Sequence, residues 1–359
     1  MKDRHKQILS DSLLLKSIHD RVEQELTIDP VKTSQLITLK FVFYLCISVI
    51  CYSGIFMIQQ PILFIGCFIL YGFSSMLFAF NFAHDFSHNT VFKNKRANNF
   101  CYTVLYTLMG AHAKAWKQRH IQSHHFAPNV EEYDSDLKIS KLIRVIPNSK
   151  YYWWHKFQHI YATLAYTTYS LFWVFIKDVV ILFSHDNYTT KKNFYYHLTF
   201  WFQKLVYIGY LFILPFEFSN QTWSVVLIGF IAMHLCQSVF LLFTFFITHH
   251  VEGTEYPTTN NEGEINTSWV MNQIKSSNDL HPFSKTANFI FGGFNNHIAH
   301  HLFPNVHHVH YPELNKVVYR VLNENGIQPN ETSYFGGIVS HLRLLKKMSS
   351  VENPQLISL

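Results

Sequence analysis

The chain has 359 residues, of which 48% are hydrophobic, 17% aromatic and only 14% charged. This charged fraction is too low for a fully water-exposed surface, so it argues against an ordinary soluble enzyme and predicts an integral membrane protein. The five cysteines form no CxxC pair, which indicates neither a disulfide framework nor a zinc ribbon. Histidine is as numerous as Asp and Glu together, 23 of each, and this excess needs a functional cause. We expect no nucleic-acid partner.

Residues 1–38 are polar and mixed in charge, and we expect them to form an N-terminal cytosolic segment. No apolar h-region follows the initial MKDRHKQ, so no cleavable signal peptide is expected. An apolar helical stripe lies within this segment, formed by Leu9, Leu13, Ile18 and Val22. The stripe fits a helix on the membrane surface and fits an ordinary amphipathic helix equally well.

Four apolar stretches predict an all-α membrane fold with four transmembrane helices in two hairpins. Residues 39–83 are apolar except for GlnGlnPro at 59–61, and at about 20 residues per crossing they contain two spans with a very short connection. The second hairpin consists of residues 205–216, lengthened by the aromatic residues before them, and residues 223–247. The sequence GluPheSerAsnGln joins these two spans.

The distribution of basic residues predicts the orientation of these spans. No Lys or Arg lies between Lys40 and Lys93, nor between Lys204 and Lys275, so both hairpin tips lack positive charge. By the positive-inside rule, the N-terminal segment, residues 93–204 and the C-terminal region therefore lie on the cytoplasmic side.

Residues 158–184 are apolar enough for a fifth span, but Lys177 and Asp178 lie inside them. A complete crossing here would place the second and third of the histidine clusters described next on opposite faces of the membrane. We therefore interpret this stretch as an interfacial or protein-buried helix.

Three histidine clusters fall in, or directly beside, regions assigned to the cytoplasmic side. HDFSH supplies His84 and His88; HIQSHH and HIAHH supply a further six, namely His120, His124, His125, His297, His300 and His301. Neutral imidazole is a good ligand for iron, zinc, copper and nickel. One HxxxH pair is a weak signal, but three clusters on one predicted face predict a shared metal site. Because a structural zinc site closes with four ligands, eight imidazoles imply two metal ions.

These motifs resemble the three histidine boxes of the membrane fatty acid desaturases, in their order and approximate separation. The segments HDFSHNTVFKNKRANN, HHFAPNVEEYDSD and GGFNNHIAHHLFPNVHHVHYPELNKVV are similar to the acyl-lipid and linoleoyl-CoA branch of that family. The resemblance runs from about residue 40 to 345. It implies a membrane desaturase domain at residues 39–347, followed by a C-terminal tail at 348–359. It also implies a four-span fold whose cytosolic helical cap holds a non-haem di-iron centre.

When the family's metal ligands are matched to this sequence residue by residue, the resemblance implies that all eight of these histidines are metal ligands. Family members add one histidine just after the last span; here ITHHVEGTEYP offers His249 and His250, and the flanking sequence favours His249. Three departures stand out. The second box has three residues between its first two histidines instead of the commoner two. The third box begins with His297 where glutamine is usual in front-end desaturases, and Phe245 replaces a water-holding asparagine known in some relatives.

The implied reaction removes two hydrogens from adjacent methylenes of a fatty acyl chain, using two iron ions, O2 and two electrons. The implied substrate is an acyl chain attached to a lipid or to coenzyme A. We find no HPGG motif of a fused haem domain, so we expect a separate donor such as ferredoxin or a small cytochrome. The protein is expected to be multi-pass in the lipid bilayer, with its termini and active site cytoplasmic. Lys114, Lys117 and Arg119 fit binding of a substrate phosphate and fit anchoring to anionic lipid.

Several neighbouring polar residues have less defined roles. Asp85, Asp134 and Asp136 are candidates to orient ligand imidazoles, although capping or surface roles fit them equally. Asn129 and Asn296 fit either hydrogen bonding near the site or turn formation. The remaining histidines near the motifs are not expected to be ligands: His155, His159, His234, His307, His308 and His310.

Two other functions use the same residues. A lipid, alkane or carotenoid hydroxylase would share the boxes and differ in retaining oxygen in its product. A histidine-rich metal transporter is disfavoured, because its ligands should lie within the spans near the membrane midplane.

Overall fold

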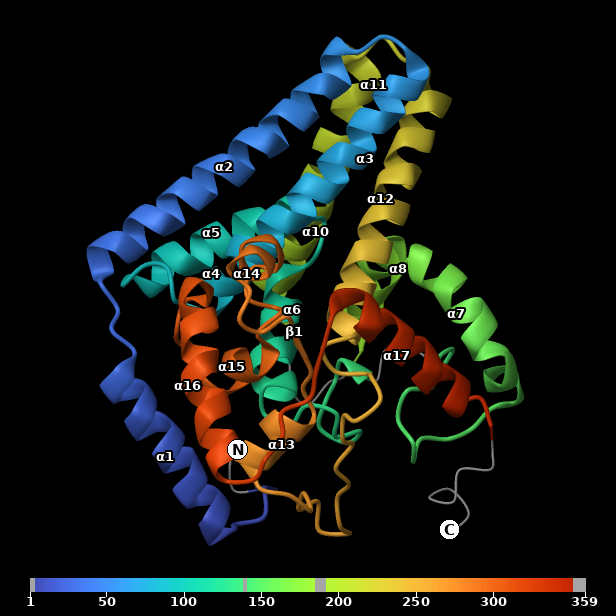
Figure 1. The fold of residues 1–359 in the computed structure, drawn as a ribbon. Coiled ribbons are helices and arrows are strands. Elements are labelled where there is room, and N and C mark those ends of the chain that lie inside the picture. The colour runs from blue at the N-terminus through green and yellow to red at the C-terminus, as the bar shows by residue number, and fades with distance from the viewer. Residues whose placement is uncertain (1–3, 138–140, 185–191, 351–359) are drawn as a thin grey trace. The chain divides into compact units, whose positions relative to one another are not determined.

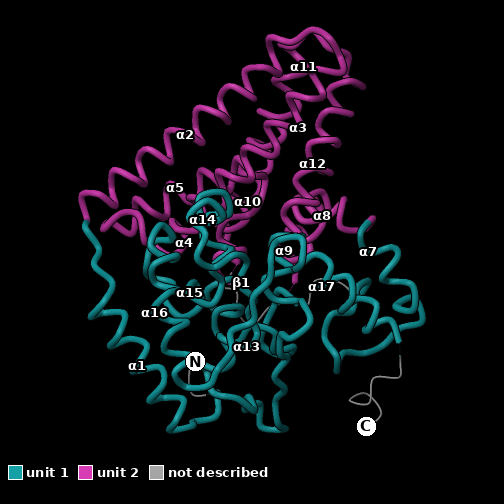
Figure 2. The backbone as a smooth tube through the Cα atoms, in the orientation of Figure 1, with its two compact units in different colours: residues 1–29, 119–163, 243–359 teal, residues 30–118, 164–242 magenta. Residues whose placement is uncertain are grey.

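The computed structural model describes residues 4–137, 141–184 and 192–350, and these are mostly helical (Figure 1). The chain divides into two compact units (Figure 2). Unit 1 comprises residues 1–29, 119–163 and 243–359, and unit 2 comprises residues 30–118 and 164–242. The chain therefore enters unit 1 three times, and each passage brings residues that are distant in the sequence.

Unit 2 contains the long apolar helices. They are α2 (Pro30–Met57); α3 (Pro61–Phe78), continued by the π-helical turn η2 (Ala79–Ala83) and α4 (His84–His88); α10 (Phe194–Ile208), continued by η7 (Gly209–Ile213) and α11 (Leu214–Phe218); and α12 (Trp223–Phe246). Within the described residues, four continuous stretches are long and apolar enough to cross a membrane, with 28, 28, 25 and 24 residues. At 1.5 Å per residue even the shortest is about 36 Å long, more than the roughly 30 Å of a hydrocarbon core. The four predicted apolar spans are thus confirmed as helices of sufficient length.

One hydrophobic cluster of unit 2 includes residues of α3 and α12, which approach closely. Phe64, Phe68 and Tyr71 recur along one face of α3 at helical spacing and are buried. Next to them lies Gly72, where an added Cβ would come within 2.4 Å of a side-chain carbon of Met233 on α12. Glycine at this position therefore allows the two helices to pack against each other.

Shorter helices complete unit 2. They are α5 (Lys95–Leu108), α6 (Ala113–Arg119), α8 (Tyr169–Leu171), η6 (Phe172–Lys177) and α9 (Asp178–Phe183). Asn94 caps α5 by accepting hydrogen bonds from the backbone N–H groups of Arg96 and Ala97.

The stretch that resembled a fifth span is broken. Residues 153–167 and 169–183 bend by 65° at their junction and are long enough for a crossing only when taken together. Asp178, in the second half, is buried and forms a 2.7 Å ion pair with Lys204. It also accepts a hydrogen bond from the backbone N–H of His112. The charge noted in the sequence is therefore paired inside the protein, as a buried carboxylate requires.

Unit 1 consists of short helices around a small core. They are α1 (Leu9–Glu25), η3 (His120–His124), η5 (Trp153–Phe157), α7 (Gln158–Thr167), α13 (Trp269–Lys275), α14 (Lys285–Phe291), α15 (His297–Leu302), η8 (His308–His310), α16 (Tyr311–Glu324) and α17 (Tyr334–Lys347). Strands β1 (Asp279–Leu280) and β2 (Glu331–Thr332) pair in parallel, with Asp279 opposite Glu331.

The N-terminal helix α1 belongs to this core. It buries Leu14, Ile18 and Val22 in the cluster that also contains Leu314 and Val318 of α16. Leu9 and Leu13, which the sequence placed on the same stripe, are instead exposed. The amphipathic helix expected from the sequence therefore packs its apolar face on protein.

Replacing Ile18 with Ala should destabilise the protein by about 2–5 kcal/mol, because Ile18 is fully buried and a cavity would remain. The measurement is thermal unfolding of the purified protein, followed by tryptophan fluorescence. Leu9→Ala on the same helix is the matched control and should change little, since Leu9 is 77% exposed. Equal effects of the two substitutions would show that α1 does not pack as described.

Candidate metal centre

Four histidines from three distant segments converge inside unit 1. The potential ligand atoms of His124, His249, His297 and His301 all lie within 4.8 Å of one another, and all four residues are buried. The Nε2 atoms of His249 and His297 are 2.6 Å apart, and those of His297 and His301 are 3.2 Å apart. Nitrogens bound to one ion at about 2.1 Å lie roughly 3–4 Å from each other. The 3.2 Å separation lies in this range and the 2.6 Å separation is shorter; with all ligand atoms within 4.8 Å, the four imidazoles could hold a single ion.

Hydrogen bonds to the opposite ring nitrogens orient three of these imidazoles. The Nδ1–H of His249 donates to the backbone carbonyl of Ser276 at 2.8 Å. The Nδ1–H of His301 donates to Oε1 of Gln273 at 2.8 Å, and that of His124 donates to Asp134 at 3.0 Å. A carbonyl oxygen can only accept, so Nδ1 carries the proton and the Nε2 of a neutral ring presents its lone pair to the cluster. Metal-binding histidines are usually held in this way.

Burial keeps most of this cluster uncharged. It lowers the pKa of His297 to about 3, and it lowers the pKa of His249 and of His301 well below the ordinary value, reinforced by the neighbouring imidazoles. Burial also acts to lower the pKa of His124, but the Asp134 carboxylate outweighs it, and the net shift is upward. At neutral pH the first three rings are unprotonated and able to bind a cation.

Asn129 connects the segments that carry these histidines. Its backbone N–H donates to the Asp134 carboxylate at 3.1 Å. Its side-chain amide lies 3.1 Å from the carbonyl oxygens of His249 and Glu255 and 3.3 Å from that of Ser276, and it donates to this group of acceptors. The residue has a φ of +61°, a left-handed conformation that asparagine tolerates better than most residues. Of the two roles left open for Asn129, the structure combines turn formation with hydrogen bonding beside the cluster.

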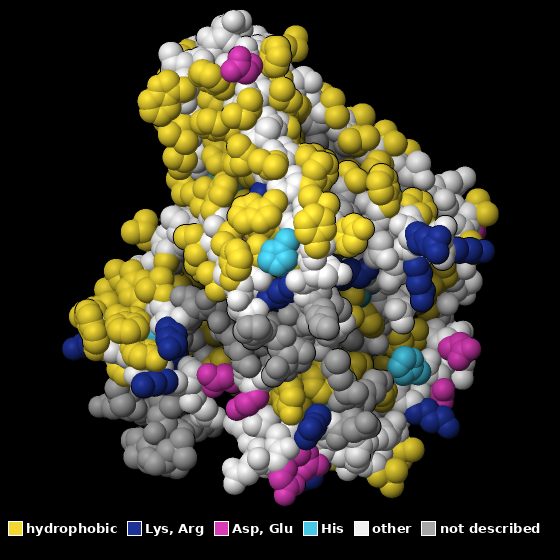
Figure 3. Space-filling view, turned by 180° about the vertical axis from the view of Figure 1, so that it is seen from behind, with side chains coloured by type: hydrophobic (Ala, Val, Ile, Leu, Met, Phe, Trp, Pro, Cys, Tyr) yellow, Lys and Arg dark blue, Asp and Glu magenta, His cyan; other side chains and the backbone are white. Residues whose placement is uncertain are grey.

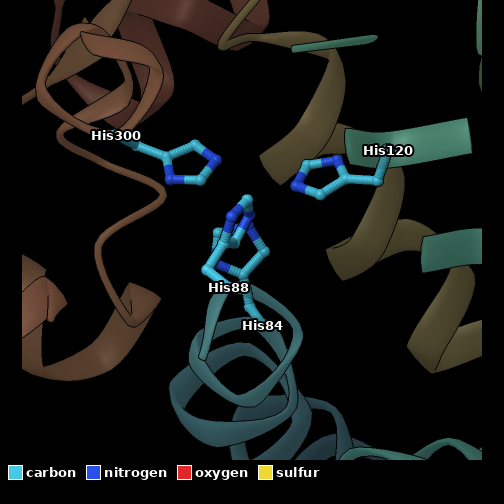
Figure 4. Close-up of side chains that lie close together, drawn as sticks. All are labelled: His84, His88, His120 and His300. Carbon is cyan, nitrogen blue, oxygen red and sulfur yellow. The ribbon is translucent and has the colours of Figure 1, made fainter. Parts of the chain in front are cut away.

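A second histidine group lies next to the first within unit 1. The Nε2 atoms of His120 and His125 are 3.1 Å apart, and the ring of His125 lies 4.5 Å from that of His300. The rings of His120 and His300 are nearly parallel and face a common space (Figure 4). The stacked rings of His125 and His301, 4.6 Å apart, join the two groups. All seven of these histidines in unit 1 thus form one continuous cluster.

The first histidine pair belongs to unit 2. His84 and His88 project from adjacent turns of α4, with ring centres 4.9 Å apart (Figure 4). The spacing i, i+4 places both on one face, as the sequence indicated. Asp85 beside them accepts a hydrogen bond from the Thr90 hydroxyl.

The side chains of the adjacent residues His249 and His250 have different surroundings. His249 lies within 4.4–5.1 Å of the rings of His124, His297 and His301. His250 instead stacks on Tyr256, whose hydroxyl is 3.1 Å from its Nδ1. This placement agrees with the sequence-based preference for His249, although ligation itself stays a prediction.

Three of the six histidines not expected to be ligands have hydrogen-bond partners of other kinds. Nδ1 of His155 accepts from the Tyr152 backbone N–H, and its Nε2–H donates to the Lys141 carbonyl. His159 lies 3.1 Å from the Ser349 hydroxyl, and His234 lies between the hydroxyls of Ser170 and Tyr207. None of these three belongs to the four-histidine group around His249.

Some residues near the cluster carry no recognisable sequence signal. Gln273 and Ser276 lie 28 and 27 residues from the histidines that they orient. Asp279 accepts hydrogen bonds from the Ile298 backbone N–H, Asn315 and Tyr319, and so it fixes the start of α15, which carries three of the histidines. A single sequence without repeated motifs gives no means of pairing such residues.

An aromatic pair lies beside the cluster. The ring of Phe245, four residues before His249, packs on that of Phe294 at 4.9 Å. Phe294 in turn lies beside His297 and His300, with ring centres 6.2 and 6.5 Å away. This side of the cluster is therefore apolar.

Comparison with known proteins gives the family. The model of the family described as fatty acid desaturase matches residues 60–333. This chain belongs to the fatty acid desaturase family. An acyl-lipid (8-3)-desaturase from Physcomitrium patens is 30% identical over 78% of this chain, and the match spans 59% of that relative's own length. An sn-1 linoleoyl-lipid 6-desaturase from Synechocystis sp. is 28% identical over 80% of this chain and 81% of its own.

The residues of this chain fit an iron centre on chemical grounds. Imidazole nitrogen is an accepted ligand of iron. In three of the buried rings the Nδ1–H donates a hydrogen bond to a neighbouring oxygen, which leaves Nε2 free to bind a cation. His124, His249, His297 and His301 would hold one ion; His120, His125 and His300 offer nitrogens for a second.

Replacing His301 with Ala should remove at least one iron of the expected pair, because the side chain lies where the two histidine groups of unit 1 meet. The measurement is iron per protein by mass spectrometry on the purified membrane protein. His159→Ala, in the same unit but hydrogen-bonded to Ser349, should retain its iron. Full iron content in the His301 variant would contradict ligation.

Replacing Asp134 with Asn should weaken iron affinity about 10- to 100-fold, the usual cost of losing a carboxylate partner of a ligand histidine. The substitution keeps the size of the side chain but removes the charge that raises the pKa of His124. Iron release to a chelator is the measurement, and exposed Glu132→Gln is the control. Equal release rates in both variants would assign Asp134 a purely structural role.

Proposed function

We propose that the protein is an O2-dependent desaturase that introduces a double bond into a fatty acyl chain. The observation that carries this proposal is the buried group His124, His249, His297 and His301 in a chain of the fatty acid desaturase family. We extend the ligand set to nine histidines, adding the group of unit 1 formed by His120, His125 and His300 and the pair of unit 2 formed by His84 and His88.

Acid or base catalysis alone cannot carry out this reaction, because a methylene C–H bond is neither polar nor acidic. When bound, an iron pair supplies, with O2, the oxidising power to remove these hydrogens. Loss of two hydrogens from the acyl chain and reduction of O2 to two waters require two further electrons and two protons. We propose that a separate donor of the ferredoxin or small cytochrome type delivers the electrons.

The chain itself holds the ligands and limits access to the site. Asp134, Gln273 and the Ser276 carbonyl keep three imidazoles in one tautomer and one orientation. Phe245 and Phe294 provide an apolar boundary beside His297, which excludes water from that side. Such fixed geometry is the protein's part in a reaction whose chemistry the cofactor supplies.

We propose four crossings with both termini and all nine histidines on the cytoplasmic side. Support comes from unit 1, where His124 and His249 belong to one group within 4.8 Å and so must lie on the same side of a membrane. Two apolar spans separate them in sequence, at residues 194–218 and 223–246. A complete crossing by residues 153–183 would make three and would part the two histidines. The positive-inside rule then gives the orientation.

The acyl carrier we propose is a glycerolipid. Relatives named as acyl-lipid and linoleoyl-lipid desaturases favour this choice over coenzyme A. Expression in a host of defined lipid composition is the direct test, with products identified by mass. Loss of two mass units from lipid-bound acyl chains is expected; a gain of sixteen would indicate hydroxylation instead, and change confined to acyl-CoA would contradict the carrier.

A cavity of about 230 Å³ in unit 2 is suited to part of the acyl chain. Its lining is apolar and includes Ala79, Leu45 and Leu105, together with three tyrosines, Tyr52, Tyr71 and Tyr210. The hydroxyls of Tyr52 and Tyr71 donate to the carbonyl and to the hydroxyl of Tyr210, so these polar atoms are paired.

Replacing Ala79 with Phe should fill this cavity and reduce conversion of the longest acyl chains most. The fatty acid profile of the expressing cells is the measurement. Ile62→Phe, 76% exposed on the same apolar span, is the matched control and should leave the profile unchanged. An unaltered profile in the Ala79 variant would show that the acyl chain binds elsewhere.

A further inference from the structure

The segment of unit 1 formed by η5 and by α7 up to residue 163 has one anchored face and one exposed face. On the anchored face, His155, Gln158 and Ala162 recur at helical spacing and are almost fully buried. The side-chain amide of Gln158 donates to the carbonyls of Arg144 and Leu345. His155 is bonded to Tyr152 and Lys141. These bonds fix the rotation of the helix and so determine which residues face outward.

The outward face is apolar. Trp153, Phe157 and Ile160 are spaced i, i+4 and i+7, and they are 74%, 48% and 68% exposed. Tyr161 and Trp154 hold the adjacent chain at residues 141–142 through bonds to the carbonyls of Leu142 and Lys141. Leu142 is itself 46% exposed. Large apolar side chains gathered in one patch on a fixed surface indicate a binding surface, unlike scattered single ones.

Basic and aromatic residues border this apolar face. Lys150 lies over the ring of Tyr152 at 5.4 Å, and Lys156 lies over that of Phe157 at 5.9 Å. Tyr152 and Trp154 stack with ring centres 4.6 Å apart. Figure 3 shows hydrophobic side chains gathered at the left of the view with Lys and Arg side chains at their border. Trp and Tyr at the edge with Lys beyond them are typical of a helix lying at a membrane surface, where long basic side chains reach the headgroups.

We propose that Trp153, Phe157 and Ile160 insert into the headgroup layer of the membrane and that Lys150 and Lys156 bind anionic lipid phosphates. A membrane is always beside this chain, because unit 2 supplies four apolar spans. Residues 153–167 number fifteen, about 22 Å of helix, which is too short to cross but suits a helix lying in the interface. The patch depends on no step of the proposed reaction, so it can be tested separately from activity.

The test uses the full-length protein in lipid nanodiscs and quenching of tryptophan fluorescence by lipids brominated near the headgroup. The contribution of Trp153 is the difference between the protein and its Trp153→Phe variant. We expect this contribution to be quenched by brominated lipid. Trp269→Phe gives the control, because Trp269 packs on the core of unit 1 and its contribution should not be quenched.

The charge requirement is tested with nanodiscs of brominated phosphatidylglycerol or phosphatidylcholine. We expect stronger quenching of Trp153 by the anionic lipid, and loss of that preference in the double variant Lys150→Glu, Lys156→Glu. Lys6→Glu, an exposed lysine elsewhere in unit 1, should keep the preference. Absence of lipid quenching at Trp153 would overturn the proposal. So would a Trp153 contribution that brominated lipid leaves unquenched but that changes when an acidic electron-donor protein is added, which would identify the patch as a protein docking surface.

Discussion

The structure of unit 1 depends on the burial of seven imidazoles in one continuous cluster. Burying so many polar rings costs free energy unless each nitrogen has a partner. Three of the Nδ1 atoms, those of His124, His301 and His249, obtain theirs from Asp134, Gln273 and the Ser276 carbonyl. The Nε2 atoms of His249 and His297, 2.6 Å apart, face each other, and two lone pairs at that distance repel unless a proton or a cation lies between them. A bound ion would relieve this repulsion, which is the physical link between the fold and the proposed chemistry.

Three passages of the chain through unit 1 provide what this cluster requires. Residues 119–163 bring the second histidine box, and residues 243–359 bring His249 and the third. The side-chain amide of Asn129, on the first of these segments, donates to the backbone carbonyls of His249 and Ser276 on the second. Residues 1–29 contribute no histidine to it; instead α1 covers the core beneath α15 and α16 with Ile18 and Val22. Stability of the site therefore rests on packing by residues that take no part in binding.

Buried polar groups in unit 2 are paired with individual neighbours, whereas the histidines of unit 1 contact one another. Asp178 is paired with Lys204, and His234 lies between the hydroxyls of Tyr207 and Ser170. Each of these groups is satisfied by a neighbour within the same unit, so they stabilise the arrangement of apolar helices. A histidine in the span is thus a structural residue here, whereas the histidines of unit 1 converge on one another.

The sequence by itself determined the four apolar spans, because crossing about 30 Å of hydrocarbon demands some 20 uninterrupted apolar residues, a local property. It also determined which histidines are candidates, since the spacing within each box places imidazoles on one side of a single turn. Its flanking residues favoured His249 over the adjacent His250, but it could not identify Gln273, Ser276 and Asp279. Those depend on how the chain folds back over about thirty residues or more, which local spacing does not encode. Periodicity was likewise ambiguous for the amphipathic stretches: α1 buries Ile18 and Val22 in the cluster shared with α16, whereas η5 and α7 leave Trp153 and Ile160 exposed. Only tertiary packing decides which apolar face meets protein, because both have the same helical repeat.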